Sequence, residues 1–155
     1  MRQHAISMIQ KVFENHDWSF TRDDDDMFFA ELELEGTLNN VRYLVLVRDD
    51  EFVSYTFFPH NVPASAYGRM AEYLHRANNY LPFCNFEFDY YESEIRIKSY
   101  VNFESCKLSY AVVENAMTFP FGLLRAHADS LMRVMYSNED LETLYLKACE
   151  TAENF

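Results

Sequence analysis

The sequence predicts an α+β domain in which helices lie on one face of an antiparallel sheet of about five strands. Two observations lead to this class. Residues 84–91 and 94–102 alternate apolar and polar side chains with a period of two, which indicates strands with one buried face. Residues 66–81 repeat apolar side chains at helical spacing, so that Met70 and Leu74 share one stripe. Strands and helices that are apolar on one side bury those sides against each other.

The composition supports one folded domain over residues 1–155. The chain has 155 residues, of which 49% are hydrophobic, and it contains 14 Phe, 11 Tyr and 1 Trp. That density of apolar side chains is typical of a domain with a real core. Only 3 Gly and 4 Pro leave little material for flexible linkers. We therefore expect a single domain.

Hydropathy, charge and cysteine usage limit where the protein can be located and what it can bind. No apolar run approaches the roughly 18 residues that a membrane helix needs, and residues 1–4 lack the apolar stretch of a signal peptide. Three cysteines at unrelated spacings are typical of reduced thiols. The formal net charge is −12, and no basic cluster is present to replace the counterions of a nucleic acid. We expect a cytoplasmic protein that binds neither nucleic acid nor membrane.

The expected elements follow the order α-β-β-β-β-α-β-β-α-α. They are a helix at 4–15, a short extended segment at 18–22, strands at 27–35, 41–48 and 51–58, a helix at about 63–81, strands at 84–91 and 94–102, a helical region at 109–136, and a terminal helix after residue 140. Pro120 interrupts the long helical region and predicts a kink or two abutting helices. Residues 137–140 resemble a capping signal for the last helix.

Opposite charges suggest the register of the hairpins. A turn at Asp49 and Asp50 places Arg48 opposite Glu51. A two-residue turn at residues 92–93 places Glu87 opposite Lys98, and the same reasoning places Glu33 opposite Arg42. A slip by one residue would turn every apolar side chain to the wrong face, so the apolar pattern fixes which face is buried.

The element order, the junction from Phe58 and Pro59 to Pro63, and the segment 131–140 resemble the YbjN family of bacterial sensory transduction regulators. Members of that family are similar in fold to type III secretion chaperones. The resemblance runs from the first helix to about Lys147, with Ser137 where many relatives carry Gly. It implies a type III secretion chaperone-like fold and a non-enzymatic, usually dimeric module, and it supplies no catalytic residues.

The residues themselves give little support to catalysis. Glycine occurs only at 36, 68 and 122, so neither a Walker A loop nor a dinucleotide-binding loop can be built. No Gly-x-Ser-x-Gly nucleophile elbow is present. Cys84 falls on the inward side of its strand, where cysteine behaves as a small hydrophobe, and no neighbouring base can be placed beside it. We expect no enzymatic activity and no cofactor.

Three groups of residues could suggest a metal or an acid–base pair, and each has an ordinary structural interpretation. Glu72 and His75 have the Glu-x-x-His spacing of di-iron bundles, but only one copy exists. The run 23–26 lacks the alternating ligands and glycine of an EF-hand loop, so we interpret it as an acidic connection between strands. His127 and Asp129 are two residues apart on a helix and point to different faces. We expect no metal.

The strands between residues 27 and 58 carry apolar side chains on both sides. The inward side carries Phe28, Leu32, Leu34, Tyr43, Val45, Val47 and Phe52. The outward side carries Phe29, Leu44, Leu46, Val53, Tyr55 and Phe57, which we call the outward patch. A sheet with one face in water needs only one apolar side. Either helices cover both sides or a bulge changes the register, or else the outward patch binds a protein.

Two classes of function remain. The first is a non-enzymatic protein-binding module, a regulatory or chaperone-like adaptor that acts through protein–protein contacts, as a homodimer or on an unidentified partner. The alternative is a small-ligand sensor domain or a metal-dependent hydrolase that uses an acidic site. An exposed apolar patch favours the first class. A deep pocket lined by carboxylates or a histidine favours the second.

Overall fold

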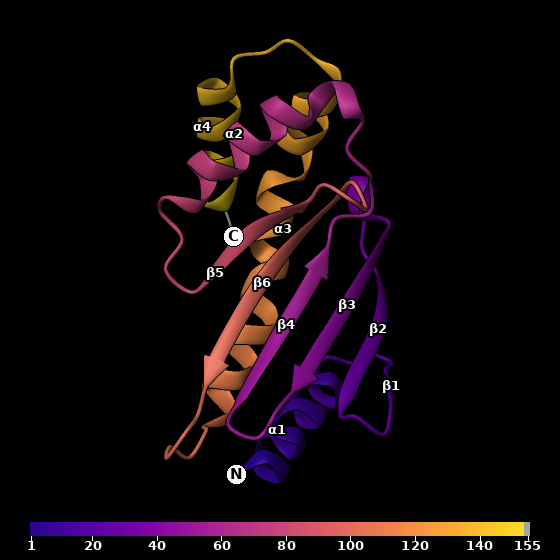
Figure 1. Cartoon of the computed structure of the whole chain (residues 1–155), viewed down its shortest axis with the longest axis vertical. Coiled ribbons are helices and arrows are strands. Elements are labelled where there is room, and N and C mark those ends of the chain that lie inside the picture. Colours follow the sequence, from indigo (N-terminus) through magenta and orange to yellow (C-terminus); the bar gives the residue numbers. More distant parts are fainter. Residues whose placement is uncertain (154–155) are drawn as a thin grey trace.

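The computed structural model describes residues 1–153, which form one six-stranded antiparallel sheet and the helices packed against it (Figure 1). The elements are α1 (Arg2–Asn15), β1 (Thr21–Arg22), β2 (Met27–Glu33), η1 (Gly36–Leu38), β3 (Asn40–Val47), β4 (Glu51–Phe57), η2 (Ala64–Ala66), α2 (Tyr67–Asn78), β5 (Cys84–Asp89), β6 (Glu94–Asn102), α3 (Tyr110–Tyr136) and α4 (Leu141–Ala152). The predicted α+β class and element order are confirmed. The strand count is six instead of about five, because the short β1 pairs with β2.

The strands lie in the order β1-β2-β3-β4-β6-β5, and every neighbouring pair is antiparallel. The first four strands form a meander. The chain then crosses through α2 and returns as a hairpin whose second strand, β6, lies beside β4 (Figure 1). One margin of the sheet is therefore formed by β1 and β2, and the other by β5.

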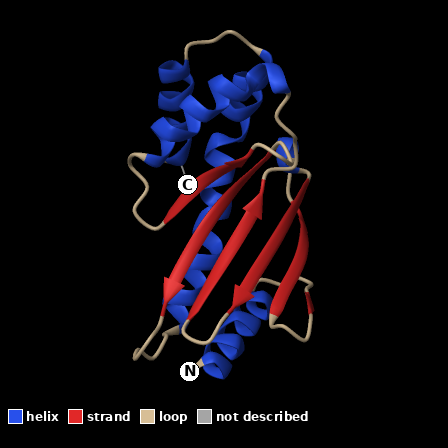
Figure 2. Cartoon of the chain, in the orientation of Figure 1, coloured by secondary structure: helices blue, strands red, loops and turns tan. Residues whose placement is uncertain are grey.

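The long helix α3 and the N-terminal helix α1 lie behind the sheet, while α2 and α4 pack at one end against α3 (Figure 1). In the described part of the chain no helix crosses the opposite face, which is turned toward the viewer in Figure 2. The expectation that helices cover only one face is thereby confirmed. This arrangement leaves the other face of the sheet available.

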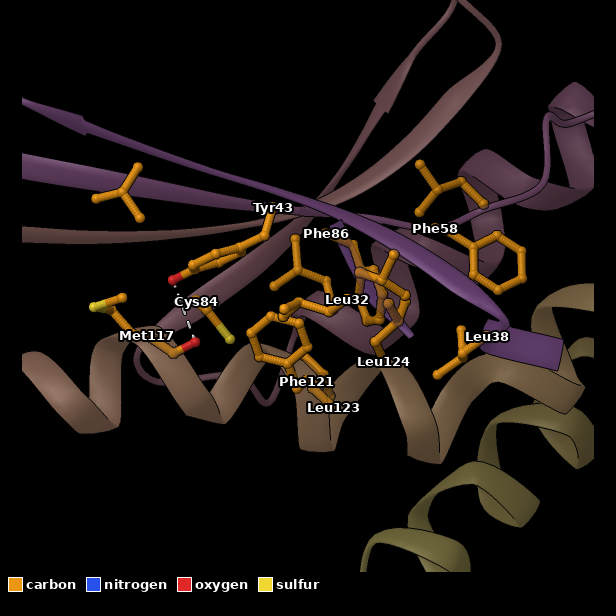
Figure 3. Packing of buried hydrophobic residues seen from close by; sticks show 14 of the residues in the cluster. Leu32, Leu38, Tyr43, Phe58, Cys84, Phe86, Met117, Phe121, Leu123 and Leu124 are labelled. Atoms are coloured by element: carbon orange, nitrogen blue, oxygen red, sulfur yellow. Dashed lines mark hydrogen bonds between the residues drawn. The ribbon is translucent and has the colours of Figure 1, made fainter. Parts of the chain in front are cut away.

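Side chains from the inward face of the sheet and from α3 form the core, as Figure 3 shows. Tyr43 is buried between the layers, and its hydroxyl donates a hydrogen bond to the carbonyl of Met117 at 3.3 Å. The centre of its ring lies 5.0 Å from the ring centre of Phe121 on α3 and 6.0 Å from that of Phe13 on α1. One inward-facing residue thus ties the sheet to both helices that cover it.

Pro120 lies within a continuous α3, so of the two predicted alternatives, a kink or two abutting helices, the second is wrong. A helix can pass through proline when neighbouring packing offsets the missing amide hydrogen bond to the carbonyl four residues earlier. Pro120 is buried, and the helix is capped where the Ser109 side chain accepts from Val112 N at 3.3 Å. The signal predicted at residues 137–140 caps α4 only through its last residue, because the Asp140 carboxylate accepts from Thr143 N at 3.0 Å, whereas Ser137 ends α3.

Two predicted registers are wrong by two residues. The hairpin β5–β6 turns over residues 90–93, where the Asp89 carboxylate accepts from the backbone N–H of Tyr91 at 2.9 Å. Glu87 consequently faces Arg96, and not Lys98. In the other hairpin the chain between β2 and β3 forms η1, and Glu31 instead of Glu33 faces Arg42. A shift of two leaves every side chain on its predicted face.

The hairpin of β3 and β4 has the predicted turn. Arg48 and Glu51 flank the turn at residues 49–50, with the Arg48 N–H bonded to the Glu51 carbonyl at 2.8 Å. Their side chains form an ion pair, also at 2.8 Å. A two-residue turn is therefore present in this hairpin, where the sequence offers two adjacent aspartates.

The two margins of the sheet are closed to different extents. At the β5 margin, the Asn78 side chain at the end of α2 donates to the Phe86 carbonyl at 2.9 Å and accepts from the Phe86 N–H at 2.7 Å. At the other margin, β1 pairs only with Phe28 and Phe29, so that β2 continues beyond its partner. Side-chain hydrogen bonds thus cover one residue of one outer strand, while part of the other outer strand has no neighbouring strand in the described chain.

Candidate protein-interaction surface

All six residues of the outward patch lie on the uncovered face of β2, β3 and β4. The register places Phe29 beside Leu44, and Leu44 beside Tyr55. Leu46 lies beside Val53 in the next row. The strands form regular ladders across these positions, without the bulge that would have turned the patch inward. The sequence pattern therefore brings these residues together on one face.

The residues of the patch are unequally exposed. Phe29 retains 44% of its accessible surface, whereas the other five are partly buried. The guanidinium of Arg42 lies 4.6 Å from the centre of the Phe57 ring, and that of Arg96 lies 4.9 Å from the centre of the Tyr55 ring. Such cation–π contacts cover aromatic faces with a polar group. Nothing larger than these side chains covers the patch within the described chain.

Ion pairs border the patch on the side of β6 and β5. Arg42 pairs with Glu94, and Arg96 pairs with Glu87 at 2.8 Å. Burial alone would raise the pKa of Glu87, but the hydrogen bonds and charges of Lys98 and Arg96 together hold it below its ordinary value. The half of the outward face over β5 and β6 therefore carries paired charges, and it is less apolar than the half over β2, β3 and β4.

An open groove of about 540 Å³ lies at the β1–β2 side of the patch. It is lined by Ser19, Phe20, Thr21, Phe29, Ala30, Glu31, Arg42, Tyr43, Leu44 and Phe57. Three members of the outward patch contribute to its wall. A shallow apolar groove of this kind suits a protein side chain or segment better than a small polar ligand, which needs an enclosed site with converging polar groups.

A second apolar region was missed by the sequence analysis. A groove of about 520 Å³ lies where β5 stops short of the end of β6, beside the N-terminal half of α3. Phe83 is 72% exposed, and its ring meets that of Phe119 edge to face with centroids 6.2 Å apart. Tyr100 is 51% exposed and also lines this groove. Tyr100 alternates outward with Arg96 and Lys98, a signal that was readable in the sequence.

The acidic run at residues 23–26 is only partly a solvated connection. Asp23 organises the turn, because its carboxylate accepts from Met27 N at 2.9 Å. Asp26 is buried, which corrects the expectation of a simple exposed loop. Hydrogen bonding from Arg22 lowers the pKa of Asp26, and an ion pair with Arg2 at 2.9 Å adds to this effect. The run thereby fastens α1 to the β1–β2 turn.

The remaining chemical candidates are separated from one another. Glu72 pairs with Arg76 at 2.7 Å, and His75 is exposed. His127 is buried and bonds through Nδ1 to the Tyr73 hydroxyl at 2.7 Å, while Asp129 pairs with Arg133 on the exposed side. Within residues 1–153 no group of three or more His, Cys, Asp or Glu side chains is placed to hold a metal ion.

The thiol of Cys84 lies on the inward face of β5. Burial raises its pKa to about 11, so the neutral thiol is the form present near neutral pH. A thiolate is the nucleophilic form of cysteine, and this environment disfavours it. The side chain therefore behaves as part of the core.

No helix among residues 1–153 combines the length and the hydropathy needed to cross a bilayer.

Two solved structures share this fold. YbjN of E. coli, a "putative transcription regulator", aligns with a TM-score of 0.53 and 11% identity, over 79% of this chain and 92% of that chain. A chain from the crystal structure of the ExsC–ExsE complex aligns with a TM-score of 0.56 and 12% identity, over 90% of this chain and 98% of that chain. At these identities the likeness concerns the fold. The open sheet with helices on one face is thus of the type III secretion chaperone-like class, as the resemblance implied.

The chain belongs to the YbjN family. The sequence model of that family, described as "Putative bacterial sensory transduction regulator", matches residues 5–136. The family resemblance inferred from the sequence is confirmed. The comparison with curated proteins gave no significant sequence match.

Proposed function

We propose that this protein is a non-enzymatic protein-binding module, a regulatory or chaperone-like adaptor of the cytoplasm that acts through the outward patch. The patch contacts a second copy of the chain in a homodimer or another protein. The observation that carries the proposal is the apolar sheet face that no helix of the described chain covers (Figure 2). Contiguous apolar surface rimmed by charges is typical of protein interfaces.

The composition of the patch supports a protein partner. Tyr55 and Phe57 are large aromatic residues of the kind that dominate binding energy at interfaces, and Phe29 is already exposed. Arg42 covers the ring of Phe57 and Arg96 covers the ring of Tyr55. Both are single side chains that can move aside without disturbing the backbone. A specific contact on this face would bury roughly 800 Å² on each partner.

The comparisons support the same class of function. The family description denotes a regulator, and the ExsC–ExsE structure contains two proteins bound to each other. A small-ligand sensor or a hydrolase has weaker support, because the groove beside the patch is open and mainly apolar. An acidic catalytic site would instead require carboxylates that converge on a cavity.

The experiment replaces Leu44 with Asp and measures mass by light scattering, with circular dichroism as the test of folding. Leu44 is partly exposed, so its replacement leaves the core intact. The expected result is a native spectrum and a fall in mass from that of a dimer to about 18.4 kDa, or loss of a partner that the unmodified chain captures. Leu146→Asp is the matched control, since Leu146 is an exposed leucine on α4.

Two outcomes contradict the proposal. If Leu44→Asp unfolds the protein and Leu146→Asp does not, Leu44 belongs to the monomer core. If the unmodified chain is a monomer at every concentration and captures the same proteins as Leu44→Asp, the outward patch is not an interaction surface.

A further inference from the structure

We propose that the β1–β2 margin of the outward face binds a lysine- or arginine-rich segment of a partner protein, whose apolar side chains enter the adjoining groove. This inference rests on the proposed function and specifies the chemistry of the partner. The groove supplies the apolar component, because Phe29, Leu44 and Phe57 line it. Its volume of about 540 Å³ is enough for a few large side chains.

The strand at this margin is accessible. The pairing of β1 with β2 stops at Phe29, whereas β2 continues to Glu33. In the described chain no strand lies beyond residues 30–33 on that side. A partner can therefore approach the groove from the margin without displacing an element of the fold.

Two carboxylates without an ion pair among residues 1–153 lie on β2, one in the wall of the groove and one two residues further along the strand. Glu31 and Glu33 point outward from β2 and are exposed, and neither carboxylate has an ion pair or hydrogen bond in the part of the chain that the structure describes. Arg42 stands directly opposite Glu31 in the register, yet its guanidinium pairs with Glu94 on β6. The cation that stands opposite Glu31 is thus paired with another carboxylate.

A comparison with other carboxylates on the same face indicates the sign of the partner's charge. On β5, Glu87 is held by both Arg96 and Lys98, and at the turn between β3 and β4, Glu51 is held by Arg48. The β1–β2 margin keeps its negative potential, in a chain whose net charge is −12. Charge complementarity speeds encounter with a basic partner and opposes an acidic one, so of the two occupants named in the proposed function it favours another protein over a second copy of this chain.

The probe is a short fluorescein-labelled peptide with a phenylalanine–leucine core flanked by lysines, and binding is followed by fluorescence anisotropy. A second peptide carries glutamate in place of each lysine. A third keeps the lysines and carries serine in place of the apolar residues. We expect only the first peptide to bind well, with an affinity that falls as salt is added, because salt screens exposed charges.

The variant Glu31→Gln/Glu33→Gln removes the charges without changing side-chain size. We expect it to weaken binding of the lysine peptide about three- to tenfold, as two rim ion pairs would. Glu142→Gln/Glu153→Gln is the matched control, because it makes the same change in net charge in the first turn and at the C-cap of α4, away from β1 and β2 (Figure 1). The control should leave binding unchanged.

Equal binding of the lysine and glutamate peptides, equal loss in both double variants, or binding by none of the peptides would each overturn the inference. The proposed function fails separately, through the Leu44→Asp measurement. If Leu44→Asp abolishes a dimer while the lysine peptide does not bind the unmodified chain, the outward patch is the interface of a homodimer, and the inference of a basic partner is wrong.

Discussion

Neighbouring residues of β4 point to opposite faces of the sheet and have different surroundings. Phe52 is completely buried beneath the helical layer, whereas Val53 is partly exposed on the uncovered face. Both are apolar, and both continue apolar rows across the sheet, since Phe52 lies beside Val47 and Val53 beside Leu46. Apolar character therefore does not decide which row is buried. The side taken by α1 and α3 decides it.

The comparison also separates two ways of covering an apolar face. On the inward side, the helices bury most of the layer, and Tyr43 joins the sheet to α3. On the outward side, the covering groups are the guanidiniums of Arg42 and Arg96, held by single side chains. Helical cover is part of the cooperative fold, whereas an arginine can move independently. The two faces should consequently respond very differently to substitution.

The largest effect is expected on the inward face. Phe52→Ala should lower the free energy of unfolding by about 3–5 kcal/mol, because it removes a large buried side chain and leaves a cavity. Urea unfolding followed by circular dichroism measures the change. A loss below about 1 kcal/mol would mean that the helical layer collapses into the space, and the distinction between the two faces would then be much weaker.

A buried histidine tests the inward layer through pH. Burial lowers the pKa of His127 to about 4, whereas an unfolded histidine titrates near 6.5. Between these values the unfolded chain binds the additional proton, so this contribution to stability is complete above about pH 6.5 and is lost as pH falls toward 4. His127→Gln should remove up to about 3 kcal/mol of the stability difference between those pH values.

Denaturant titrations at several pH values measure that difference. His75→Gln is the control, because His75 lies on the exposed side of α2. Equal pH dependence in the unmodified chain and in His127→Gln would show that the helical layer accommodates a charged imidazole.

A smaller effect is expected one residue along the strand from Phe52. Val53→Ala should cost about 1 kcal/mol, because its side chain is only partly removed from water and strand propensity adds a little. The same urea experiment applies. A cost equal to that of Phe52→Ala would indicate that the outward row is packed as tightly as the core, contrary to its observed exposure.

The smallest stability effect is expected for the groups that cover the outward aromatics. Arg42→Ala removes one cation–π contact and one exposed ion pair, which together contribute no more than about 1 kcal/mol. Binding of a hydrophobic dye should increase, since the face of Phe57 is uncovered. Arg125→Ala, an exposed arginine on α3, is the control. An unchanged dye signal would show that Arg42 does not shield the patch.

Much of this fold was predictable because its strands alternate cleanly. Period-two patterns assigned the inward and outward residues correctly even where the hairpin register was wrong, since a shift by two conserves the face. The errors arose where loops decide the outcome. The Asp89 carboxylate stabilises a four-residue turn at 90–93, a side-chain contact that the alternation does not report.

The candidate site was predictable only in part, for a physical reason. The sequence placed all six outward residues on one face, but it gave no sign that Arg42 and Arg96 stack on Phe57 and Tyr55. Those contacts depend on side-chain rotamers and on the choice of Arg42 between Glu31 and Glu94. The unneutralised margin at β2 results from that choice, and so it became visible only in three dimensions.

The amide of Asn78 makes the two edges of the sheet unequal for pairing with another strand. Edge-to-edge polymerisation requires a monomer with two reactive ends, in the same way that a linear polymer requires a bifunctional unit. Asn78 occupies both backbone groups of Phe86 on β5, whereas residues 30–33 of β2 have no neighbouring strand on their outer side in the described chain. A strand added at β5 would therefore have to displace the Asn78 amide, and a strand added at β2 would not. This inequality between the two edges works against the repeated addition that a fibre needs.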